Sequence, residues 1–348
     1  MTDDTLIPVT VLTGFLGSGK TTILARLVRD PAFADTAVIV NEFGDVGLDH
    51  LLMEATEESI VDLSCGCVCC TIRGDLMTTL IDLYERREAG EIRPFRRVIL
   101  ETTGLADPAP IIHTLMQEPL VFAHYRLARV VTAIDAINGM ATLDAQPEAV
   151  KQAAVADALL VTKTDMSNDA AALAALESRL AGLNPSAPQV RAVEGDIEPA
   201  LLFAGGMYDP AGKGADVAAW LAREAADKAG PAHVHDVNRH GSDIRTYAIR
   251  RENPISPGAL SVFLQMLADQ RGDDLLRLKG IVRLTESPER PAVVHGVQHV
   301  IHPIRRLDAW PDGMRGTSIV LIVRGIDRDW AENLFDRACE SAYALLTA

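Results

Sequence analysis

The stretch "PVTVLTGFLGSGKTT", residues 8–22, decides the fold, because it joins an apolar run to a glycine-rich loop and a helical pattern. Its segment "GFLGSGKT", residues 14–21, matches the P-loop pattern G-x-x-x-x-G-K-[ST] without a mismatch. The alternative is a glycine-rich turn that merely precedes a helix. That alternative is disfavoured, because both the pattern and its strand–helix context are satisfied. The sequence therefore predicts a binding site for a nucleoside triphosphate.

Each residue type in this loop has a role in binding phosphate. Glycines let consecutive backbone N–H groups turn inward around phosphate oxygens, and the helix N-terminus adds positive potential. Lys20 is expected to reach the β- and γ-phosphates, and the hydroxyl of Thr21 is expected to ligate Mg²⁺. The residues predicted to bind nucleotide here are Gly14, Gly17, Ser18, Gly19, Lys20, Thr21 and Thr22.

Outward from the loop, short β-rich runs alternate with helical patterns over the first two hundred residues. The runs are rich in Val, Ile and Leu without polar alternation, which is typical of strands buried on both faces. The predicted strands are 8–13, 37–41, 59–63, 97–101, 128–135, 158–162 and 189–192, and the main predicted helices are 21–29, 75–87, 111–117 and 170–181. Repeated βα units predict an α/β P-loop NTPase domain with a mainly parallel sheet and helices on both faces.

The pattern changes from about residue 202. Segments rich in Gly, Pro and Asp predict a linker over 202–243, and residues 244–348 show strands, a helix at 257–268, and a last helix at 328–344. Ser256 followed by Pro257 fits an N-cap and first helical position. We expect a P-loop domain over 1–201 and a small α+β domain over 244–348.

Charge and hydropathy exclude several classes of protein. With 33 basic and 48 acidic residues the net charge is −15, which argues against a general nucleic-acid binder. No apolar run reaches the roughly 18 residues of a membrane span. The beginning "MTDDTLIPVT" lacks the basic region of a secretory signal, so we expect a cytoplasmic protein. A hydrophobic content of 48% is sufficient for a large core.

Two further strand ends carry residues suited to nucleotide chemistry. "VTKTD", residues 161–165, resembles the guanine-reading motif Asn-Lys-x-Asp, with Thr162 where Asn is usual. Asp165 can accept two hydrogen bonds from the guanine N1–H and amine, which adenine does not offer, and Lys163 would lie along the base. This predicts GTP. The departure at Thr162 weakens the prediction of tight guanine selectivity.

The segment "VILETTGLADP", residues 98–108, places Glu101 where the Walker B motif usually has Asp. Glu101 could hold a Mg²⁺-bound water or orient the attacking water, and the Gly104 amide could contact the γ-phosphate. The alternative is a strand–turn junction with a capping acid.

Four of the five cysteines lie within six positions, at Cys65, Cys67, Cys69 and Cys70. Thiolates suit Zn²⁺, Co²⁺ or Cu⁺. A structural zinc site usually has two separated pairs of ligands, whereas here there is one tight cluster. An open site of two or three thiolates, completed by another group, fits a metal that is handed on. A structural knuckle and a redox pair are the alternatives.

Four motifs in order, "GFLGSGKTT", "VNEFGDVGLD" at 40–49, "GCVCC" and "ETTGLADP", resemble the CobW-type P-loop GTPases. That family includes cobalamin-biosynthesis, nitrile-hydratase-activator and zinc-transfer members. "LKGIVRL", residues 278–284, resembles its small carboxyl-terminal domain. The resemblance implies a GTP-dependent metallochaperone that delivers metal to a client metalloprotein, a cobalamin-synthesis enzyme or another metal-inserting enzyme.

The resemblance also implies roles for particular residues. Cys67, Cys69 and Cys70 match the metal-binding C-x-C-C, while Glu42 and Asp45 match an acidic switch segment between nucleotide and metal. Asp45 joins Lys20 and Glu101 as a catalytic candidate. Cys65 is extra, and the His-rich run of some members is reduced here to His233, His235 and His240, which are either surface residues or a weak metal site.

Together these observations predict a GTPase whose nucleotide and metal sites are linked. GTP and Mg²⁺ would order the switch segment and tighten a Zn²⁺ or Co²⁺ site, and hydrolysis would release the metal. Intrinsic turnover is expected to be slow, because no clear arginine finger is found in cis. The alternatives are a P-loop NTPase with a structural metal knuckle and a non-enzymatic metal buffer.

Overall fold

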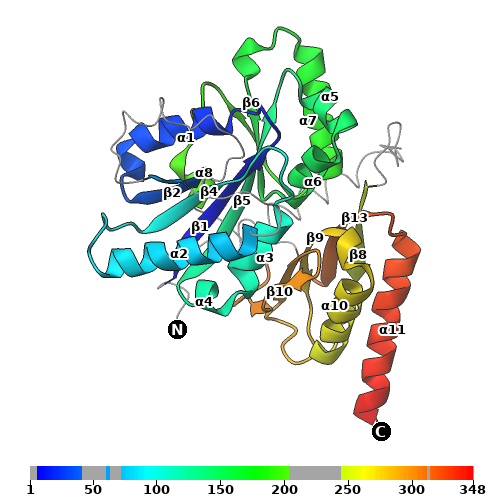
Figure 1. The fold of residues 1–348 in the computed structure, drawn as a ribbon. Coiled ribbons are helices and arrows are strands. Elements are labelled where there is room, and N and C mark those ends of the chain that lie inside the picture. The colour runs from blue at the N-terminus through cyan, green and yellow to red at the C-terminus, as the bar shows by residue number, and fades with distance from the viewer. Residues whose placement is uncertain (1–5, 41–59, 63–71, 204–243, 312–313, 348) are drawn as a thin grey trace. The chain divides into compact units, whose positions relative to one another are not determined.

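The computed structural model describes residues 6–40, 60–62, 72–203, 244–311 and 314–347 (Figure 1). The chain divides into two compact units. The first comprises Met1–Ala181 with Ala187–Gly212, and the second comprises Gly182–Ser186 with Lys213–Ala348. The predicted linker falls almost entirely outside the described residues and stays a prediction.

The first unit is built on a seven-stranded sheet in the order β3-β2-β4-β1-β5-β6-β7, and each neighbouring pair is parallel. The strands are β1 (Ile7–Gly14), β2 (Thr36–Val40), β3 (Ile60–Asp62), β4 (Arg97–Glu101), β5 (Tyr125–Asp135), β6 (Ala158–Thr162) and β7 (Gln189–Ala192). The predicted parallel sheet is confirmed. β2 and β6 are buried along their whole length, which explains their continuous apolar runs.

Helices cover this sheet, and their bounds are α1 (Lys20–Arg29), α2 (Ile72–Glu88), α3 (Ala109–Gln117), α4 (Pro119–Phe122), α5 (Gly139–Ala145), α6 (Pro147–Val155), α7 (Ala170–Leu183) and α8 (Pro199–Phe203). Ile23 and Leu24 of α1 and Leu202 of α8 pack against one face of the sheet. On the other face, the hydroxyl of Thr132 in β5 donates to the backbone oxygen of Gln152 in α6 at 2.7 Å. Four helices were predicted, and α4, α5, α6 and α8 were not.

The strand order determines where a ligand can bind. β1 lies between β4 and β5, and α1 leads from β1 to β2 on one side while β5 and β6 continue on the other. In open α/β sheets, ligands bind outside the carboxyl ends of the strands where the order reverses. The loop that follows β1 lies at this point.

The second unit is an antiparallel sheet in the order β11-β10-β9-β13-β8, with β12 paired to β10. Its elements are β8 (Ile244–Arg251), α10 (Pro257–Arg271), β9 (Leu275–Val282), β10 (Ala292–Val297), β11 (Val300–Ile301), β12 (Arg305–Arg306), β13 (Thr317–Arg324) and α11 (Arg328–Thr347). The predicted N-cap is confirmed, because Ser256 Oγ accepts from the Ala259 amide at 3.1 Å.

The core of the second unit lies between its two helices and one face of its sheet. Phe263 of α10 and Phe335 of α11 meet edge to face, with ring centroids 5.1 Å apart. The predicted small α+β domain is thus confirmed.

No helix among the described residues combines the length and the apolar character needed to cross a membrane.

Candidate functional site

The loop after β1 folds back around its own lysine. Lys20 is only 7% exposed, and its Nζ donates to the backbone oxygens of Gly14 at 2.9 Å and Phe15 at 3.2 Å. Because α1 begins at Lys20, the N–H groups of its first turn face the loop and have no carbonyl four residues earlier in the helix. These groups and the ammonium make a site for a phosphate anion.

All three glycines of the loop have a positive φ, which favours glycine. Gly14 has a φ of +139°, and a Cβ built there would lie 2.4 Å from the Ala133 oxygen of β5. Gly19 has a φ of +93° and caps α1. Gly17 likewise has a positive φ, +73°, although a Cβ there would meet open space. Ser18 is 2% exposed, Thr21 is half-buried, and Thr22 is exposed.

Thr162, the last residue of β6, forms a hydrogen bond to the phosphate loop. Its hydroxyl donates to the Ser18 oxygen at 2.7 Å and contacts the Ile134 oxygen at 3.2 Å. Thr162 is 4% exposed, and its side chain lies 3.6 Å from a Cβ built at Gly19. The residue that departs from the guanine motif therefore links β6 to the phosphate loop.

The end of β4 lies directly beside the end of β1. Leu12 is the register partner of Glu101, and the Thr102 amide donates to the Leu12 oxygen at 3.0 Å. Glu101 is 6% exposed. In the turn that follows, a Cβ on Gly104 would lie 2.6 Å from the Leu16 nitrogen, so only glycine fits against the phosphate loop there. The structure thus places Glu101 beside the end of β1 and Gly104 against the phosphate loop.

Lys163 and Asp165 follow β6 at the same edge of the sheet, and Lys163 lines a hollow beside Phe15 and Ser18. Lys163 has a left-handed φ of 57°, and its Nζ bonds to Asp135 Oδ2 at 2.9 Å. Asp165 follows in the short 3₁₀ turn η4 (Thr164–Met166) and is exposed. The turn therefore presents a carboxylate to solvent at the carboxyl edge of the sheet.

Asp135 was missed by sequence reasoning, although it is the last residue of a correctly predicted strand. Besides Lys163, it accepts from the Ile137 amide at 2.8 Å and from Asn138 Nδ2 at 3.1 Å. Burial favours its neutral form, but these hydrogen bonds outweigh burial and lower the pKa of Asp135. Asp135 also lines the hollow beside Phe15 and Ser18.

A second missed feature is the loop that follows β7. Glu194 and Gly195 both have positive φ, and a Cβ on Gly195 would lie 3.0 Å from the Thr22 oxygen. Asp196 pairs with Arg26 of α1 at 3.1 Å. This loop therefore packs against the first turns of the helix that carries the phosphate site.

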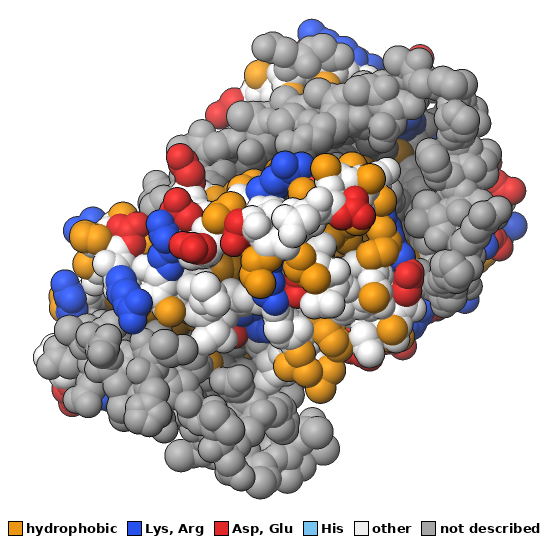
Figure 2. Space-filling model, turned by 90° about the horizontal axis from the view of Figure 1, so that it is seen from above, with side chains coloured by type: hydrophobic (Ala, Val, Ile, Leu, Met, Phe, Trp, Pro, Cys, Tyr) orange, Lys and Arg blue, Asp and Glu red, His pale blue; other side chains and the backbone are white. Residues whose placement is uncertain are grey.

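The loops at this edge also expose large apolar side chains, one after each of five strands: Leu16 (60%), Leu105 (58%), Ile137 (48%), Met166 (63%) and Val193 (44%). Seen from above, hydrophobic side chains gather in the middle of the visible surface (Figure 2). Apolar side chains exposed together at one edge of a sheet are candidates for a binding surface.

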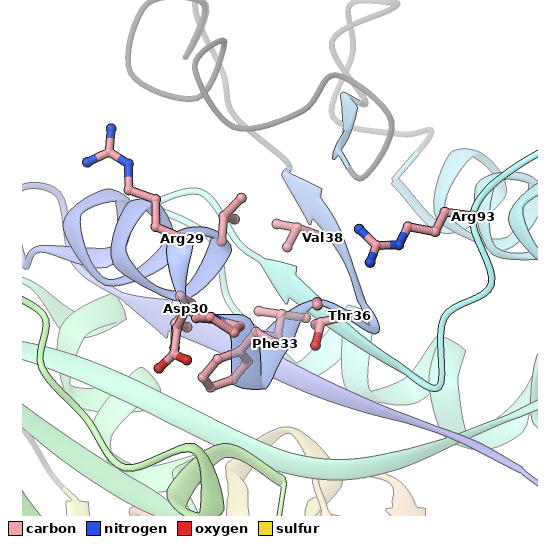
Figure 3. Close-up of a pocket in the computed structure, with 11 residues that line it drawn as sticks. Arg29, Asp30, Phe33, Thr36, Val38 and Arg93 are labelled. Carbon is pink, nitrogen blue, oxygen red and sulfur yellow. The ribbon is translucent and has the colours of Figure 1, made fainter.

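Another hollow lies away from these residues. It is lined by Leu27, Val38 and Ile99, with Arg93 at its rim. Arg93 points toward Val38, whereas Arg29 points away (Figure 3). None of the predicted site residues lines it.

The predicted metal site cannot be compared with the structure in the same way. Glu42, Asp45, Cys65, Cys67, Cys69, Cys70, His233, His235 and His240 all lie outside the described residues. Within the part of the chain that is described, no three His, Cys, Asp or Glu side chains form a group suited to a metal ion.

Comparison with known proteins gives matches to both units. The family described as "CobW/HypB/UreG, nucleotide-binding domain" matches residues 8–191, and the "Cobalamin synthesis protein cobW C-terminal domain" matches residues 244–339. The zinc chaperone YjiA of Escherichia coli (strain K12) is 32% identical over 294 residues, which cover 84% of this chain and 87% of YjiA. The zinc chaperone CobW of Sinorhizobium sp is 29% identical over 347 residues, covering 91% and 92%.

A solved structure is similar over nearly the whole length. The crystal structure of Zn(II)-bound YjiA GTPase from E. coli has a TM-score of 0.71 at 25% identity and covers 96% of this chain and 99% of that chain. A Zn(II)-bound triple mutant of YjiA, with one glutamate and two adjacent cysteines replaced by alanine, matches equally well.

Proposed function

Because the chain belongs to the CobW/HypB/UreG family and carries the CobW carboxyl-terminal domain, we propose that it is a GTP-hydrolysing metallochaperone for Zn(II) or Co(II). The observation that carries this proposal is the phosphate loop, folded around Lys20, in a chain whose relatives are zinc chaperones. The nucleotide is the substrate, and the transition metal is the cargo.

The phosphate end of the site would bind and activate the triphosphate. Lys20 and the first-turn N–H groups of α1 balance phosphate charge as it shifts toward the leaving diphosphate. Thr21 and Glu101 fit Mg²⁺, because a hydroxyl and a carboxylate at one edge are the hard oxygen ligands it prefers. When bound, Mg²⁺ would neutralise charge on the β- and γ-phosphates. Glu101 would hold a metal-bound water or orient the attacking water, and the Gly104 amide would contact the γ-phosphate.

The other end would select the base. Asp165 is exposed in a turn fixed by the Lys163–Asp135 ion pair, which suits a carboxylate that accepts from guanine N1–H and its amine. Adenine would leave that carboxylate without either donor, and an unsatisfied charged acceptor is costly. GTP is therefore preferred over ATP.

The metal would bind at Cys67, Cys69 and Cys70, completed by Glu42 or Asp45. Thiolates are suitable ligands for zinc, and intrinsic affinities favour Zn²⁺ over Co²⁺. The YjiA variant without a glutamate and two adjacent cysteines also contains Zn(II), so the cysteines of this chain need a direct test. In the GTP state the switch segment would be ordered and metal would bind more tightly.

Delivery requires a partner, which we propose is a client metalloprotein or metal-inserting enzyme. The five exposed apolar side chains at the carboxyl edge would give this client a surface next to the nucleotide. Intrinsic turnover would be slow, and docking of the client would accelerate it.

The decisive experiment is a competitive Zn²⁺ titration with and without Mg²⁺ and a non-hydrolysable GTP analogue. We expect the analogue to tighten Zn²⁺ binding relative to GDP by about 5–150-fold, and Cys67→Ser/Cys69→Ser/Cys70→Ser to abolish this difference. Cys339→Ser is the matched control, because this thiol lies on α11 of the second unit. Equal zinc affinities with analogue and GDP would contradict the proposal.

Two further readouts separate the alternatives. A structural knuckle predicts that chelation unfolds the chain and that nucleotide does not affect metal affinity. A non-enzymatic buffer predicts no multiple-turnover phosphate release, whereas a GTPase releases phosphate and loses this activity in Lys20→Ala.

A further inference from the structure

Helix α6 forms hydrogen bonds to the turn that follows β4. Gln152 lies in the middle of this helix and is 0% exposed. Its Nε2 donates to the Gly104 oxygen at 3.1 Å and to the Ala106 oxygen at 2.9 Å. One side-chain amide therefore fixes two carbonyls of the same turn, and the turn cannot shift without breaking both bonds.

The neighbouring residue of α6 fixes the end of the turn. Lys151 Nζ bonds to Asp107 Oδ2 at 3.0 Å. The other oxygen of that carboxylate accepts from the Ala109 amide at 3.0 Å, where α3 begins. α6 is itself held to the sheet by the bond from Thr132 to the Gln152 backbone oxygen. The turn is thus attached to β5 through α6.

On its other side the same turn touches the phosphate loop. A Cβ on Gly104 would lie 2.6 Å from the nitrogen and 2.8 Å from the Cα of Leu16. Gly104 is therefore confined between Leu16 and the amide of Gln152. The position of the Gly104 N–H relative to the phosphate loop depends on that amide.

Gln152 makes its hydrogen bonds to this turn through its donor atom alone. Its Oε1 is buried and has no hydrogen-bond partner among the residues that the structure describes. A buried acceptor left unsatisfied costs about 1–3 kcal/mol. An apolar side chain would avoid that cost but would leave the Gly104 and Ala106 oxygens without this donor. The side chain therefore acts on the turn through its two donated bonds.

We propose that Gln152 is the positioning residue through which the Gly104 turn distinguishes a nucleoside triphosphate from a diphosphate. This inference rests on the proposed function, in which the Gly104 amide contacts the γ-phosphate. Gln152 touches no nucleotide. It holds the turn where its amide meets the third phosphate, so its loss weakens binding of GTP and leaves GDP binding, which lacks that phosphate, unchanged.

The test measures Kd for GDP and for a non-hydrolysable GTP analogue, both with Mg²⁺, in wild type and Gln152→Leu. We expect the ratio of the Kd for GDP to the Kd for the analogue to fall about tenfold in Gln152→Leu, which is within the usual range of coupling between sites. The ratio falls because the analogue binds more weakly while GDP binds as it does to the wild type. Gln152→Glu should behave in the same way, because an ionised carboxylate cannot donate to the Gly104 and Ala106 oxygens.

The matched control is Gln189→Leu. Gln189 Nε2 also donates to a helix carbonyl, that of Glu177 at 2.8 Å, and its Oε1 is likewise buried without a partner in the described part of the chain. This control should leave the ratio unchanged. Should Gln152→Leu fail to fold, Lys151→Met removes the partly exposed ion pair to Asp107 and should lower the ratio by a smaller factor.

The outcomes separate this inference from the proposed function. A wild-type protein that binds no guanine nucleotide would contradict the proposed function itself. A wild type that prefers the analogue, together with a Gln152→Leu variant that keeps the same preference, would overturn the inference alone. A parallel loss of GDP and analogue affinity would also overturn it, because that is the result expected of a residue that only supports the fold.

Discussion

The two ends of the candidate nucleotide site are built differently, although both lie at the carboxyl edge of one sheet. At the phosphate end, Ser18 and Lys20 are almost fully buried and the shape of the loop is fixed by backbone conformation. At the proposed base end, Asp165 is exposed, and the Lys163 side chain remains 33% exposed. The first is a preformed backbone cradle, and the second is a side-chain contact on a short turn.

This difference predicts that the phosphate end sets the affinity for nucleotide and that the base end sets which base is preferred. Phosphates are common to all nucleoside triphosphates, so the buried loop should set how tightly any of them binds. A single exposed carboxylate can change which base is preferred without changing the loop. Substitutions at the phosphate end should therefore affect GTP and ATP alike, whereas substitutions at the base end should affect GTP alone.

The largest effect is expected from Lys20→Ala. The substitution removes the buried ammonium and leaves the Gly14 and Phe15 oxygens without this donor. Multiple-turnover phosphate release should fall by at least about 100-fold, the usual loss when one preorganised donor is removed. A thermal unfolding curve checks that the variant remains folded. Turnover close to that of wild type would remove Lys20 from the catalytic set.

Asp165→Ala should have the next largest effect, on GTP alone. Loss of hydrogen bonds to a charged acceptor costs about 1.5–3 kcal/mol, or roughly 10–150-fold in affinity. Competition between GTP and ATP for a fluorescent nucleotide measures this change. Asp169→Ala is the control, because Asp169 accepts from the Ala171 and Ala172 amides at the start of α7. An equal loss for ATP would place Asp165 outside the base site.

Thr162→Val tests to which end of the site Thr162 belongs. The substitution keeps the shape of the side chain and removes the hydroxyl that donates to the Ser18 oxygen. A buried carbonyl left unsatisfied should lower the free energy of unfolding by about 1–3 kcal/mol, measured by chemical denaturation. GTP and ATP affinities should fall together, and Thr162→Ser should restore them. A selective loss of GTP would assign Thr162 to the base end instead.

The smallest effect is expected from Asp135→Asn, which weakens the support of Lys163. The pKa of Asp135 lies below its ordinary value of 3.8, so the folded state favours the carboxylate. The carboxylate of Asp135 contributes its full share to the free energy of unfolding when the pH is above the ordinary pKa of 3.8. This contribution is lost as the pH falls through the lower pKa of the folded state. The difference in unfolding free energy between wild type and variant should therefore be constant at neutral pH and should shrink below about pH 4. A difference that grows on acidification would contradict this assignment.

The helices show where sequence patterns were informative. Helices α1, α2, α3 and α7 were predicted, with ends that shift by a few residues. Helix α6, "PEAVKQAAV", was missed, although Pro147 in its first position is a helix-start signal. Gln152 was missed as well, because glutamine is usually a surface residue.

By itself the sequence determined the strand–loop–helix unit around residues 8–22 and the seven strands of the parallel sheet, because these depend on local patterns and residue types. It also predicted nucleotide chemistry at the ends of β1, β4 and β6. Only the tertiary structure decided which strand ends meet. Lys163 pairs with Asp135 across 28 residues, Gln152 reaches Gly104 across 48, and Thr162 supports Ser18 across 144. The order of strands in a sheet is set by how each crossover packs, which no local pattern records.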